Sequence, residues 1–417
     1  MMTGLSIANQ FDRTRLARVA DGLAVAVAVS MPWSTSATGI LLALWLLALI
    51  PTLDWADLRR TIATPAGGLP VLLFLLGVVG MLWADVTLIE RWKGLDSFFK
   101  LLVIPLLLVQ FQRSDRGLQV FIGYAVSCIV LLVLSTAAQF ISAFSFIPMQ
   151  WDHVLVKNAA TQSGEFISCI FGLLFLAIDS CERRRWSWVI GLLLVVLGMV
   201  ANIFYVATGR TALVVIPVLL VILAVRKLNG RGILVLFAGA IFVGGIGWFS
   251  SPYLRDRTIQ IWTDFQSYEA ADARNSSGER IEFWKKSAGF VREAPIFGHG
   301  TGTIESLFAK SVVGQSGASA SATTNPHNQT FAVAIQLGLV GVTVLWAIWI
   351  AHLLLFRGSG LAEWIGLVIV VQNIVGSLFN SHLFDFVQGW VYVVGVGVAG
   401  GMALKNRTAD KSAGLAP

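Results

Sequence analysis

The sequence predicts an all-α protein that crosses a membrane about twelve times and carries one large insertion with short helices outside the lipid. Hydrophobic residues make up 56% of the 417 residues, charged residues make up only 13%, and the mean hydropathy is +0.76. A soluble domain carries roughly 25% charged residues, so lipid must be the solvent for most of this chain. Lipid admits only helices and closed barrels, and the apolar stretches here are continuous instead of alternating, which favours helices.

Twelve apolar segments are predicted to span the membrane, because about 20 helical residues cross its hydrocarbon core. Arg13, Arg15 and Arg18 precede the first segment, as in the start of a signal peptide. No clear small-residue cleavage site follows, so we expect an uncleaved first helix. The predicted spans are 19–33, 38–53, 67–84, 96–111, 118–146, 163–179, 187–207, 211–225, 232–250, 330–356, 361–379 and 385–404.

These spans divide the chain into three parts. Residues 1–250 hold the first nine spans, residues 251–329 form the insertion, and residues 330–417 hold the last three spans and a tail. Lys and Arg are concentrated in every second loop between the spans, and short basic loops stay in the cytoplasm. The pattern predicts that both termini are cytoplasmic and that the insertion faces outward.

The insertion is long for a connection between two helices, and such long loops are usually functional or disordered. Ser276 and Glu279 have the spacing of a capping box, Ser-x-x-Glu, which predicts a helix that ends at Pro295. Residues 311–325 are rich in Gly, Ser, Ala and Thr, and we expect them to be mobile.

Composition also narrows the range of ligands. The net charge of +7 is spread over short loops with no concentrated basic face, so nucleic acid is not a predicted partner. All three cysteines lie outside the insertion, which argues against disulfides and against a thiol metal site. No outer loop shows paired carboxylates or Asp-x-Asp for a divalent cation. We therefore expect no metal and no cofactor.

The segment Asn325-Pro326-His327 opens the tenth predicted span. Asn is a good N-cap and Pro suits the first helical position, so the pattern predicts His327 in the first helical turn, at the outer membrane boundary. The partial positive charge of a helix N-terminus disfavours imidazolium and attracts phosphate. This arrangement predicts a neutral base beside an anion site, as hydroxyl attack on a sugar diphosphate requires. The alternative is an interfacial histidine that only caps its helix.

Gly338 and Gly341 follow His327 by 11 and 14 residues. At about 100° per residue, all three residues would share one face of the helix. Glycines on that face let a neighbouring helix approach closely, which would fix the rotation of the histidine. Ordinary helix packing through small residues is the alternative.

Two arginines are candidates to hold phosphate on the outer side. Arg210 lies in a tight outer turn between the seventh and eighth spans, where a charge close to hydrocarbon is costly unless it is used. Arg280 lies in the capped helix of the insertion. Guanidinium matches phosphate oxygens with paired donors. The alternatives are that Arg210 only extends to the interface and that Arg280 is a solvated surface residue.

Weaker candidates lie in the same outer region. Arg91 and Lys93, in the outer loop after the third span, are candidates to help hold a pyrophosphate. Residues 297–302 are glycine-rich and could nest an anion, although an ordinary loop is the better interpretation. His382 and Asp385 lie near the outer end of the last span, where an acid is a functional candidate.

The motif that begins at His327 resembles the signature of the O-antigen ligase family. That signature reads His-[Asn/Ser/Gln]-x9-Gly-x-x-Gly-[Thr/Val], and here His327-Asn328 is followed by nine residues and then by Gly338-Leu339-Val340-Gly341-Val342. The family also resembles this chain in its number of spans, its large insertion between spans 9 and 10, and its outward arginines. Protein O-oligosaccharyltransferases and some O-antigen polymerases share versions of the motif.

The resemblance implies an inverting, metal-independent glycosyltransferase of GT-C-like type, in the bacterial inner membrane, that acts in lipopolysaccharide biosynthesis. Its donor would be O-antigen polysaccharide on undecaprenyl pyrophosphate, and its acceptor would be a sugar hydroxyl of lipid A–core at the periplasmic face. His327 maps onto the motif histidine as general base, and Arg210 and Arg280 match the arginines that bind the diphosphate. Because both substrates are lipid-anchored, the site would open laterally to membrane lipids.

The sequence leaves other functions open. A protein O-oligosaccharyltransferase would use the same donor with a Ser or Thr acceptor, and a polymerase would extend the same glycan. From another class, a secondary transporter would show broken helices and buried ions near the midplane. The candidate polar residues cluster instead at the outer boundary, which favours chemistry on a membrane-borne substrate.

Overall fold

The computed structural model describes residues 3–140 and 154–413, and these residues form helices and loops with no β-strand. The predicted all-α class is confirmed. The first part contains α1 (Thr3–Ser30), α2 (Thr35–Leu49), η1 (Ile50–Thr52), α3 (Trp55–Ile62), α4 (Pro65–Gly80), α5 (Leu88–Phe99), η2 (Lys100–Leu102), α6 (Val103–Arg113), α7 (Gly117–Ala137), α8 (Ala159–Glu182), α9 (Trp186–Tyr205), α10 (Ala212–Lys227) and α11 (Gly230–Ser250). The rest contains α12 (Pro252–Ala271), α13 (Ser276–Glu293), α14 (Ile304–Ser311), η4 (Gly317–Ala320), α15 (Gln329–Leu355), α16 (Leu361–Gly376) and α17 (Phe386–Ala413).

Every predicted span overlaps a helix, although residues 141–146 of the fifth span lie outside the described residues. Within the described part of the chain, eight helical segments are long and apolar enough to cross a membrane, and α3 with α4, bent by 83°, would add a ninth. α10 and α16 have only 16 residues each, and residues 12–21 of α1 include five charged side chains. The membrane class is therefore confirmed, whereas the count of twelve spans is not.

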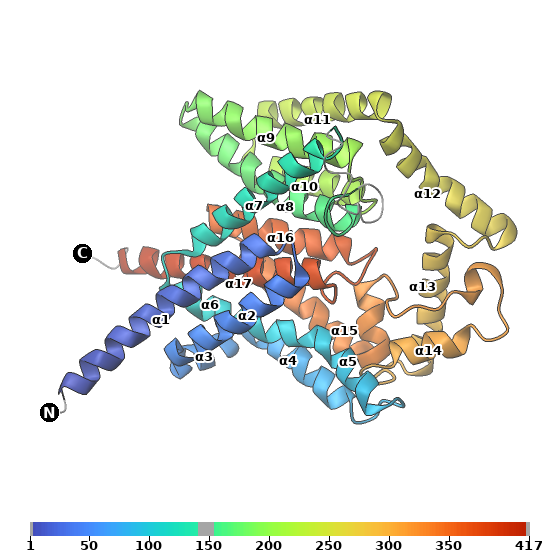
Figure 1. Ribbon diagram of the computed structural model, residues 1–417, viewed down its shortest axis with the longest axis horizontal. Helices are drawn as coiled ribbons and strands as arrows, with labels where there is room; N and C mark the ends of the chain where they lie inside the picture. Colours follow the sequence, from blue (N-terminus) through green and yellow to red (C-terminus); the bar gives the residue numbers. More distant parts are fainter. Residues whose placement is uncertain (1–2, 141–153, 414–417) are drawn as a thin grey trace.

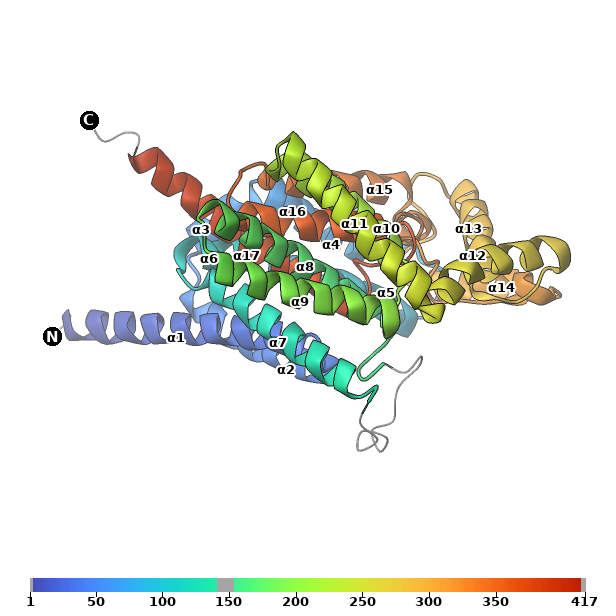
Figure 2. The same ribbon diagram turned by 90° about the horizontal axis from the view of Figure 1, so that it is seen from above.

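The helices outside the insertion lie side by side in one bundle, with α17 near its centre (Figures 1 and 2). α17 packs against α6 and α16, and every residue from 391 to 401 is buried. α11 is the opposite case, because Gly247 is its one buried residue. Such a helix suits the lipid-facing surface of the bundle, since apolar side chains face lipid at no cost.

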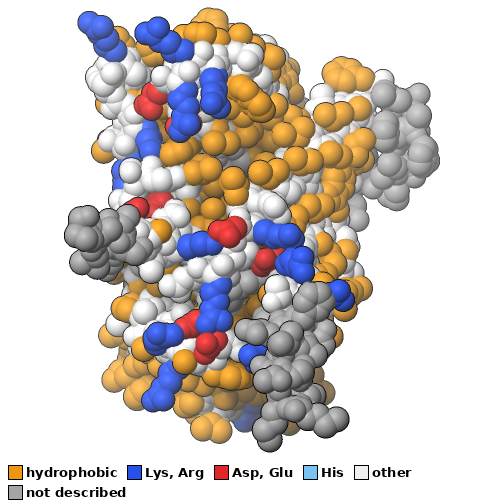
Figure 3. Space-filling model, turned by 90° about the vertical axis from the view of Figure 1, so that its left-hand side faces the viewer, with side chains coloured by type: hydrophobic (Ala, Val, Ile, Leu, Met, Phe, Trp, Pro, Cys, Tyr) orange, Lys and Arg blue, Asp and Glu red, His pale blue; other side chains and the backbone are white. Residues whose placement is uncertain are grey.

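The basic loops gather at the end of the bundle that carries both termini. Figure 3 shows Lys and Arg side chains over this end, interspersed with acidic ones. Arg113 pairs with Asp54 at 3.1 Å, and Lys405 pairs with Asp115. The insertion projects from the opposite end (Figure 1). This separation agrees with the predicted topology, while the side of the membrane that each end faces stays a prediction from the positive-inside rule.

The insertion helix that carries Arg280 is capped by a different residue from the one predicted. Asn275 is the N-cap of α13, and its side chain accepts the N–H of Gly278 at 2.8 Å. Ser276 is the first helical residue, and Glu279 instead accepts hydrogen bonds from Arg274 and Ser321. The predicted capping box is therefore wrong, although the helix itself and its end before Pro295 are confirmed.

Helix α15 is interrupted at Gly338, whose φ of 60° and ψ of −156° are not helical. Residues 295–302 fill the break. The carbonyls of Ile335 and Gln336 accept hydrogen bonds from N–H groups of this segment at 2.8 and 2.9 Å, and the N–H groups of Leu339 and Val340 donate to its carbonyls at 2.8 and 3.2 Å. The backbone groups freed by the break are thus satisfied inside the protein, as lipid requires.

Glycine is required at the break for two reasons. A positive φ is costly for other residues, and a Cβ at Gly338 would lie 2.3 Å from the backbone oxygen of Ile296. The expected face shared by His327, Gly338 and Gly341 is wrong, because His327 precedes the helix and Gly338 breaks it. A Cβ at Gly341 would first meet the side chains of Leu337 and Val333 of the same helix.

The glycine-rich segment 297–302 belongs to the stretch that fills the break in α15. The N–H groups of residues 298–302 are all used, four of them on backbone carbonyls and that of Gly302 on the Gln336 side chain at 2.9 Å. An anion nest needs free N–H groups that point to one place. The ordinary-loop interpretation is therefore the correct one.

Candidate active site

The candidate site lies where three segments from distant parts of the sequence meet. These are the loop 323–328 before α15, the first turns of α13, and the loop 377–385 between α16 and α17. All three lie at the end of the bundle that carries the insertion (Figure 1). His327 stands at their centre.

His327 lies in the left-handed region, with φ of 52°, and not in a helical turn. Asn328 is the N-cap of α15, because its side chain accepts the N–H of Phe331 at 3.1 Å, so the predicted cap at Asn325 is wrong. The backbone of His327 is held on both sides, since its N–H donates to Asn325 Oδ1 at 2.9 Å and its carbonyl accepts from Trp284 Nε1 at 3.3 Å. A strained backbone that the surroundings enforce in this way is typical of functional sites.

The hydrogen bonds around His327 define its tautomer. A backbone N–H can only donate, so Asn325 presents its oxygen to His327 and its Nδ2 to Asn380. The Asn380 atom in contact is then an oxygen, which accepts from Asn325 at 2.9 Å and from His327 Nδ1 at 3.1 Å. His327 therefore carries its proton on Nδ1. No described residue bonds to Nε2, so its lone pair is available to a substrate.

The imidazole is held neutral. Burial, and next the positive charge of Arg280, lower the pKa of His327 to about 4, while the Asn380 bond and Glu279 act in the opposite direction. The ring of Phe283 stacks on it at 5.9 Å between centroids. The sequence-based expectation of a neutral imidazole agrees with this result, but the cause is burial and a neighbouring arginine instead of a helix N-terminus.

Arg210 is fixed by the insertion. It precedes α10, and its Nη2 lies 3.2 Å from Asp264 of α12 while its Nη1 lies 3.3 Å from Ser277 of α13. Ser277 also donates to Asp264 at 3.2 Å. With 18% of its side chain exposed, Arg210 is held inside the protein and does not extend into solvent.

Arg280 lies beside Arg210 without a carboxylate partner in the described part of the chain. Burial, and next the charge of Arg210, lower the pKa of Arg280. Burying a cation next to another cation is costly, and buried charges in proteins are normally paired. The unpaired guanidinium is therefore suited to bind an anionic group.

The two arginines line one open groove of about 480 Å³, which we call the arginine groove. Most of its remaining lining is apolar and comes from α12, α13 and the loop after α16, including Trp262, Phe265, Trp284 and Phe379. Trp262 is 63% exposed. The groove therefore combines a place for an anionic group with a surface for an apolar chain.

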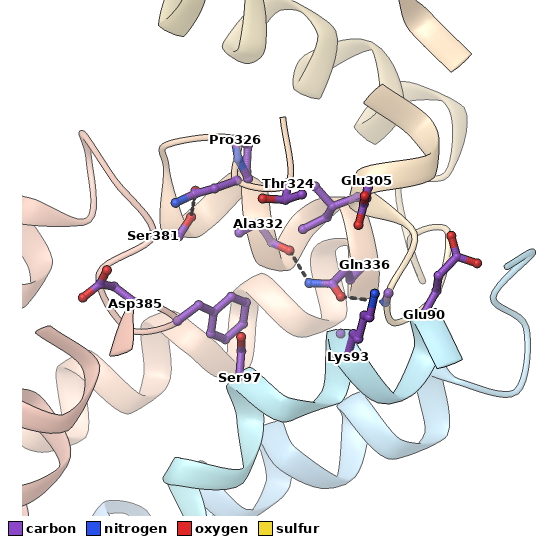
Figure 4. A pocket seen from close by; sticks show the side chains of 15 residues that line it. Glu90, Lys93, Ser97, Glu305, Thr324, Pro326, Ala332, Gln336, Ser381 and Asp385 are labelled. Atoms are coloured by element: carbon purple, nitrogen blue, oxygen red, sulfur yellow. Dashed lines mark hydrogen bonds between the residues drawn. The ribbon is translucent and has the colours of Figure 1, made fainter. Parts of the chain in front are cut away.

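Arg91 and Lys93 do not line the arginine groove. Both lie on α5, which begins at Leu88, so their predicted place in a loop is wrong. Arg91 donates to the carbonyls of Met81 at 2.8 Å and Val86 at 3.1 Å and closes the C-terminal end of α4. Lys93 lines a separate hollow of about 230 Å³ (Figure 4).

The remaining sequence candidates lie in the loop before α17. Asp385 caps α17 by accepting the N–H of Gln388 at 3.0 Å. The ring of His382 packs against Gly376, where a Cβ would lie 2.2 Å from it, and its buried Nδ1 has no hydrogen-bond partner among the described residues. Both belong to the loop 377–385, which positions Asn380 and Ser381. Ser381 donates to Asn325 Oδ1 at 2.7 Å and so completes the network.

Sequence reasoning missed Asn380, Asp264 and Ser277. Asn380 and Ser381 directly precede His382, which the sequence analysis had already named as a candidate. They lie in a short polar stretch between two apolar spans, and this was a usable signal. The contacts of Asn380 with His327 and of Ser381 with Asn325 need the fold. No group of three or more His, Cys, Asp or Glu residues that could hold a metal ion occurs within residues 3–140 and 154–413.

Two comparisons with known proteins add to this geometry. A family described as O-antigen ligase matches residues 200–346, which include Arg210, Arg280, His327 and both motif glycines. A protein of Haemophilus influenzae, described only as uncharacterized, is 23% identical over 251 residues, or 59% of this chain. The matched region spans 61% of that relative's length.

Proposed function

We propose that this protein, whose residues 200–346 match the O-antigen ligase family, is a membrane glycosyltransferase that attaches O-antigen polysaccharide to lipid A–core. The donor is the polysaccharide on undecaprenyl pyrophosphate, and the acceptor is a sugar hydroxyl of the core. The site faces the periplasm from the bacterial inner membrane, with both termini in the cytoplasm. The observation that carries this proposal is the unpaired Arg280 beside Arg210, next to an imidazole with a free Nε2.

The arginine groove suits a polyprenyl diphosphate in both of its parts. The diphosphate supplies the negative charge that Arg280 lacks, and guanidinium groups bind phosphate oxygens with paired hydrogen bonds. The exposed aromatic lining from α12 and α13 accepts the first apolar units of the lipid. Inorganic phosphate makes no use of the apolar surface.

In the proposed reaction, His327 Nε2 takes the proton of the acceptor hydroxyl while that oxygen attacks the anomeric carbon of the donor sugar. The bond from the anomeric carbon to the diphosphate oxygen breaks, and the electron pair leaves with the diphosphate. Attack from the face opposite the leaving group inverts the anomeric centre. Arg210 and Arg280 stabilise the charge that develops on the leaving group, and such preorganised charge is usually the largest catalytic contribution.

Donor binding also improves the base. Burial is the larger cause that lowers the pKa of His327 and Arg280 is the second, so a diphosphate on Arg280 counteracts the second cause and raises the pKa above about 4. A general base is most efficient when its pKa lies near the working pH. His327 thus becomes an effective base when the donor is in place.

The test is transfer in vitro from defined lipid-linked glycan to purified lipid A–core. We expect His327→Ala to lower kcat by about 10²–10⁴-fold and Arg280→Ala by about 10²–10³-fold. Arg292→Ala is the matched control, because Arg292 is an exposed arginine on the same helix α13. Wild-type transfer by correctly folded His327→Ala would refute the role of the base.

Two related activities use the same donor and are separated by the acceptor. Transfer to a pilin-like protein in place of lipid A–core would identify a protein O-oligosaccharyltransferase, and longer glycan on the donor lipid would identify a polymerase. The transporter alternative gains a broken helix, α15, but residues 295–302 fill that break with bonded backbone groups. This leaves the break without the free carbonyls by which transporters hold ions.

A further inference from the structure

The second hollow at this end of the bundle, which we call the polar hollow, has no role in the donor site. It lies between α5, residues 302–305, residues 324–326, the first turns of α15 and the loop 377–385, and has a volume of about 230 Å³. Lys93 and Ser97 extend from α5 toward it, and Thr324 and Glu305 face them from the other side (Figure 4).

His327 stands in the partition between the polar hollow and the arginine groove. Residues 324–326 line the polar hollow, and His327 is the next residue in the chain. On the other side, Trp284 lines the arginine groove and donates its indole N–H to the carbonyl of His327. Phe379, also in the groove, precedes Asn380, which accepts the hydrogen bond of His327 Nδ1.

The two cavities differ in charge. The arginine groove holds two guanidinium groups, one of them unpaired. The polar hollow is lined by the carboxylates of Glu90, Glu305 and Asp385 and by the ammonium of Lys93, and the Lys100 ammonium behind its wall bonds to the backbone carbonyls of Phe384 and Asp385. An excess of negative charge repels a diphosphate. The polar hollow therefore suits an uncharged ligand that is rich in hydroxyl groups.

Several side chains of the polar hollow are available to such a ligand. The side chains of Lys93, Ser97, Glu305 and Thr324 make no hydrogen bond with any described residue. Gln336 is different, because it accepts from Gly302 at 2.9 Å and donates to Ala332 at 2.9 Å, so it is part of the wall. The free ammonium, hydroxyls and carboxylate supply both donors and acceptors, as recognition of a sugar ring requires.

We propose that the polar hollow is the acceptor subsite and binds one uncharged sugar ring of the core saccharide, whose hydroxyl then reaches His327. This inference rests on the proposed function. It assigns donor and acceptor to opposite sides of the base, and it gives Lys93 a role in sugar binding in place of the diphosphate role expected from the sequence.

Binding of glycolipid to the protein in nanodiscs tests the subsite without requiring catalysis. The probes are lipid A–core and lipid A without core sugars, so that their difference isolates the saccharide. We expect wild-type protein to bind lipid A–core more tightly than lipid A, and Lys93→Gln and Glu305→Gln each to weaken lipid A–core binding about tenfold while leaving lipid A binding unchanged. Lys310→Gln is the control, because Lys310 lies on α14 with Glu305 and pairs only loosely with Asp85, at 4.0 Å.

The outcomes separate the subsite from the function. If wild-type protein binds both probes equally, or if neither variant changes lipid A–core binding, the subsite is overturned. If the variants lose saccharide binding as expected but the wild-type protein transfers no glycan to lipid A–core, the subsite stands and the proposed function fails. Where transfer does occur, the variants should raise the KM for the acceptor about tenfold and leave the KM for the donor unchanged.

Discussion

The arginines at the two ends of this protein have different surroundings, and the difference separates topology from function. At the end with the termini, Arg113 pairs with Asp54 and Asp57 and is 45% exposed. At the end with the insertion, Arg280 is mostly buried, pairs with no carboxylate among the described residues and lies near a second arginine. Paired, solvated arginines in short loops indicate which end of the protein faces the cytoplasm. A buried arginine without a partner indicates a ligand.

The largest effect is expected from replacing the buried, unpaired Arg280 with glutamine, in comparison with the same replacement of the exposed, paired Arg113. Arg280→Gln should lower glycan transfer by about 10³-fold, because it removes the positive charge that stabilises the leaving diphosphate. The same variant should raise the melting temperature of the substrate-free protein by roughly 2–4 °C, because it removes repulsion from Arg210.

Arg113→Gln should change neither quantity by much, because exposed ion pairs contribute about 0–1 kcal/mol. Transfer and thermal unfolding are measured on both variants in the same detergent. A marked loss of stability in Arg280→Gln would indicate that this arginine is a structural element, and the contrast between the two ends would disappear.

The next effect concerns Asn380, which should matter through the tautomer of His327. Asn380→Ala removes the acceptor of the Nδ1 proton and should lower kcat by about 10–100-fold. Asn380→Asp keeps the acceptor and adds a negative charge, which raises the pKa of His327 by about 1–3 units.

The pH profile of kcat/KM measures this shift. Transfer needs neutral imidazole, so activity is retained above the pKa and lost as the pH falls through it, near pH 4 in the wild type. The acid limb of Asn380→Asp should lie at a higher pH. Superimposable profiles of the aspartate variant and the wild type would exclude the proposed contact.

A smaller effect, on stability, is expected at the motif glycine. Gly338→Ala forces a residue with a side chain into a positive φ and against the oxygen of Ile296, which should cost about 3 kcal/mol. Gly239→Ala in α11 is the control, because nothing lies within 4 Å of a Cβ there. Thermal unfolding compares the two, and equal stability would show that the break in α15 does not need glycine.

The smallest effect is expected at Arg91. This arginine lies at the end with the insertion, but its guanidinium is already bound within the protein, like that of Arg113 at the other end. Arg91→Gln loses hydrogen bonds to two carbonyls, so unfolding should become easier by about 1 kcal/mol. The KM for the donor should not change. A clear rise in the KM for the donor, with unchanged stability, would show that Arg91 helps to bind the diphosphate.

Much of the fold followed from apolar segment length, because lipid leaves a chain few choices besides helices. The details that failed are local ones. Asn325 and Asn328 are both good caps and three residues apart, so the sequence could not select the one that starts α15. A glycine that breaks a helix looks the same in sequence as one that packs in it, and only the docked segment 295–302 distinguishes them.

The sequence predicted several residues of the site but not the contacts between them. Arg210 and Arg280 stood out because charge in an outer turn or a capped helix needs a reason, and the structure brings them into one groove. The same reasoning placed Arg91 and Lys93 in that site, where they do not lie. Asn380 was missed because a short polar stretch between two apolar spans marks a candidate loop but does not reveal the distant histidine that Asn380 contacts.

Binding of undecaprenyl pyrophosphate to the protein in nanodiscs tests the central claim most directly. The account predicts that Arg280→Gln weakens this binding by at least about tenfold, the loss expected for one charge-assisted contact to phosphate, and that Arg113→Gln leaves it unchanged. Equal affinity of the wild type and Arg280→Gln would contradict the account, because the unpaired arginine would then not hold the donor.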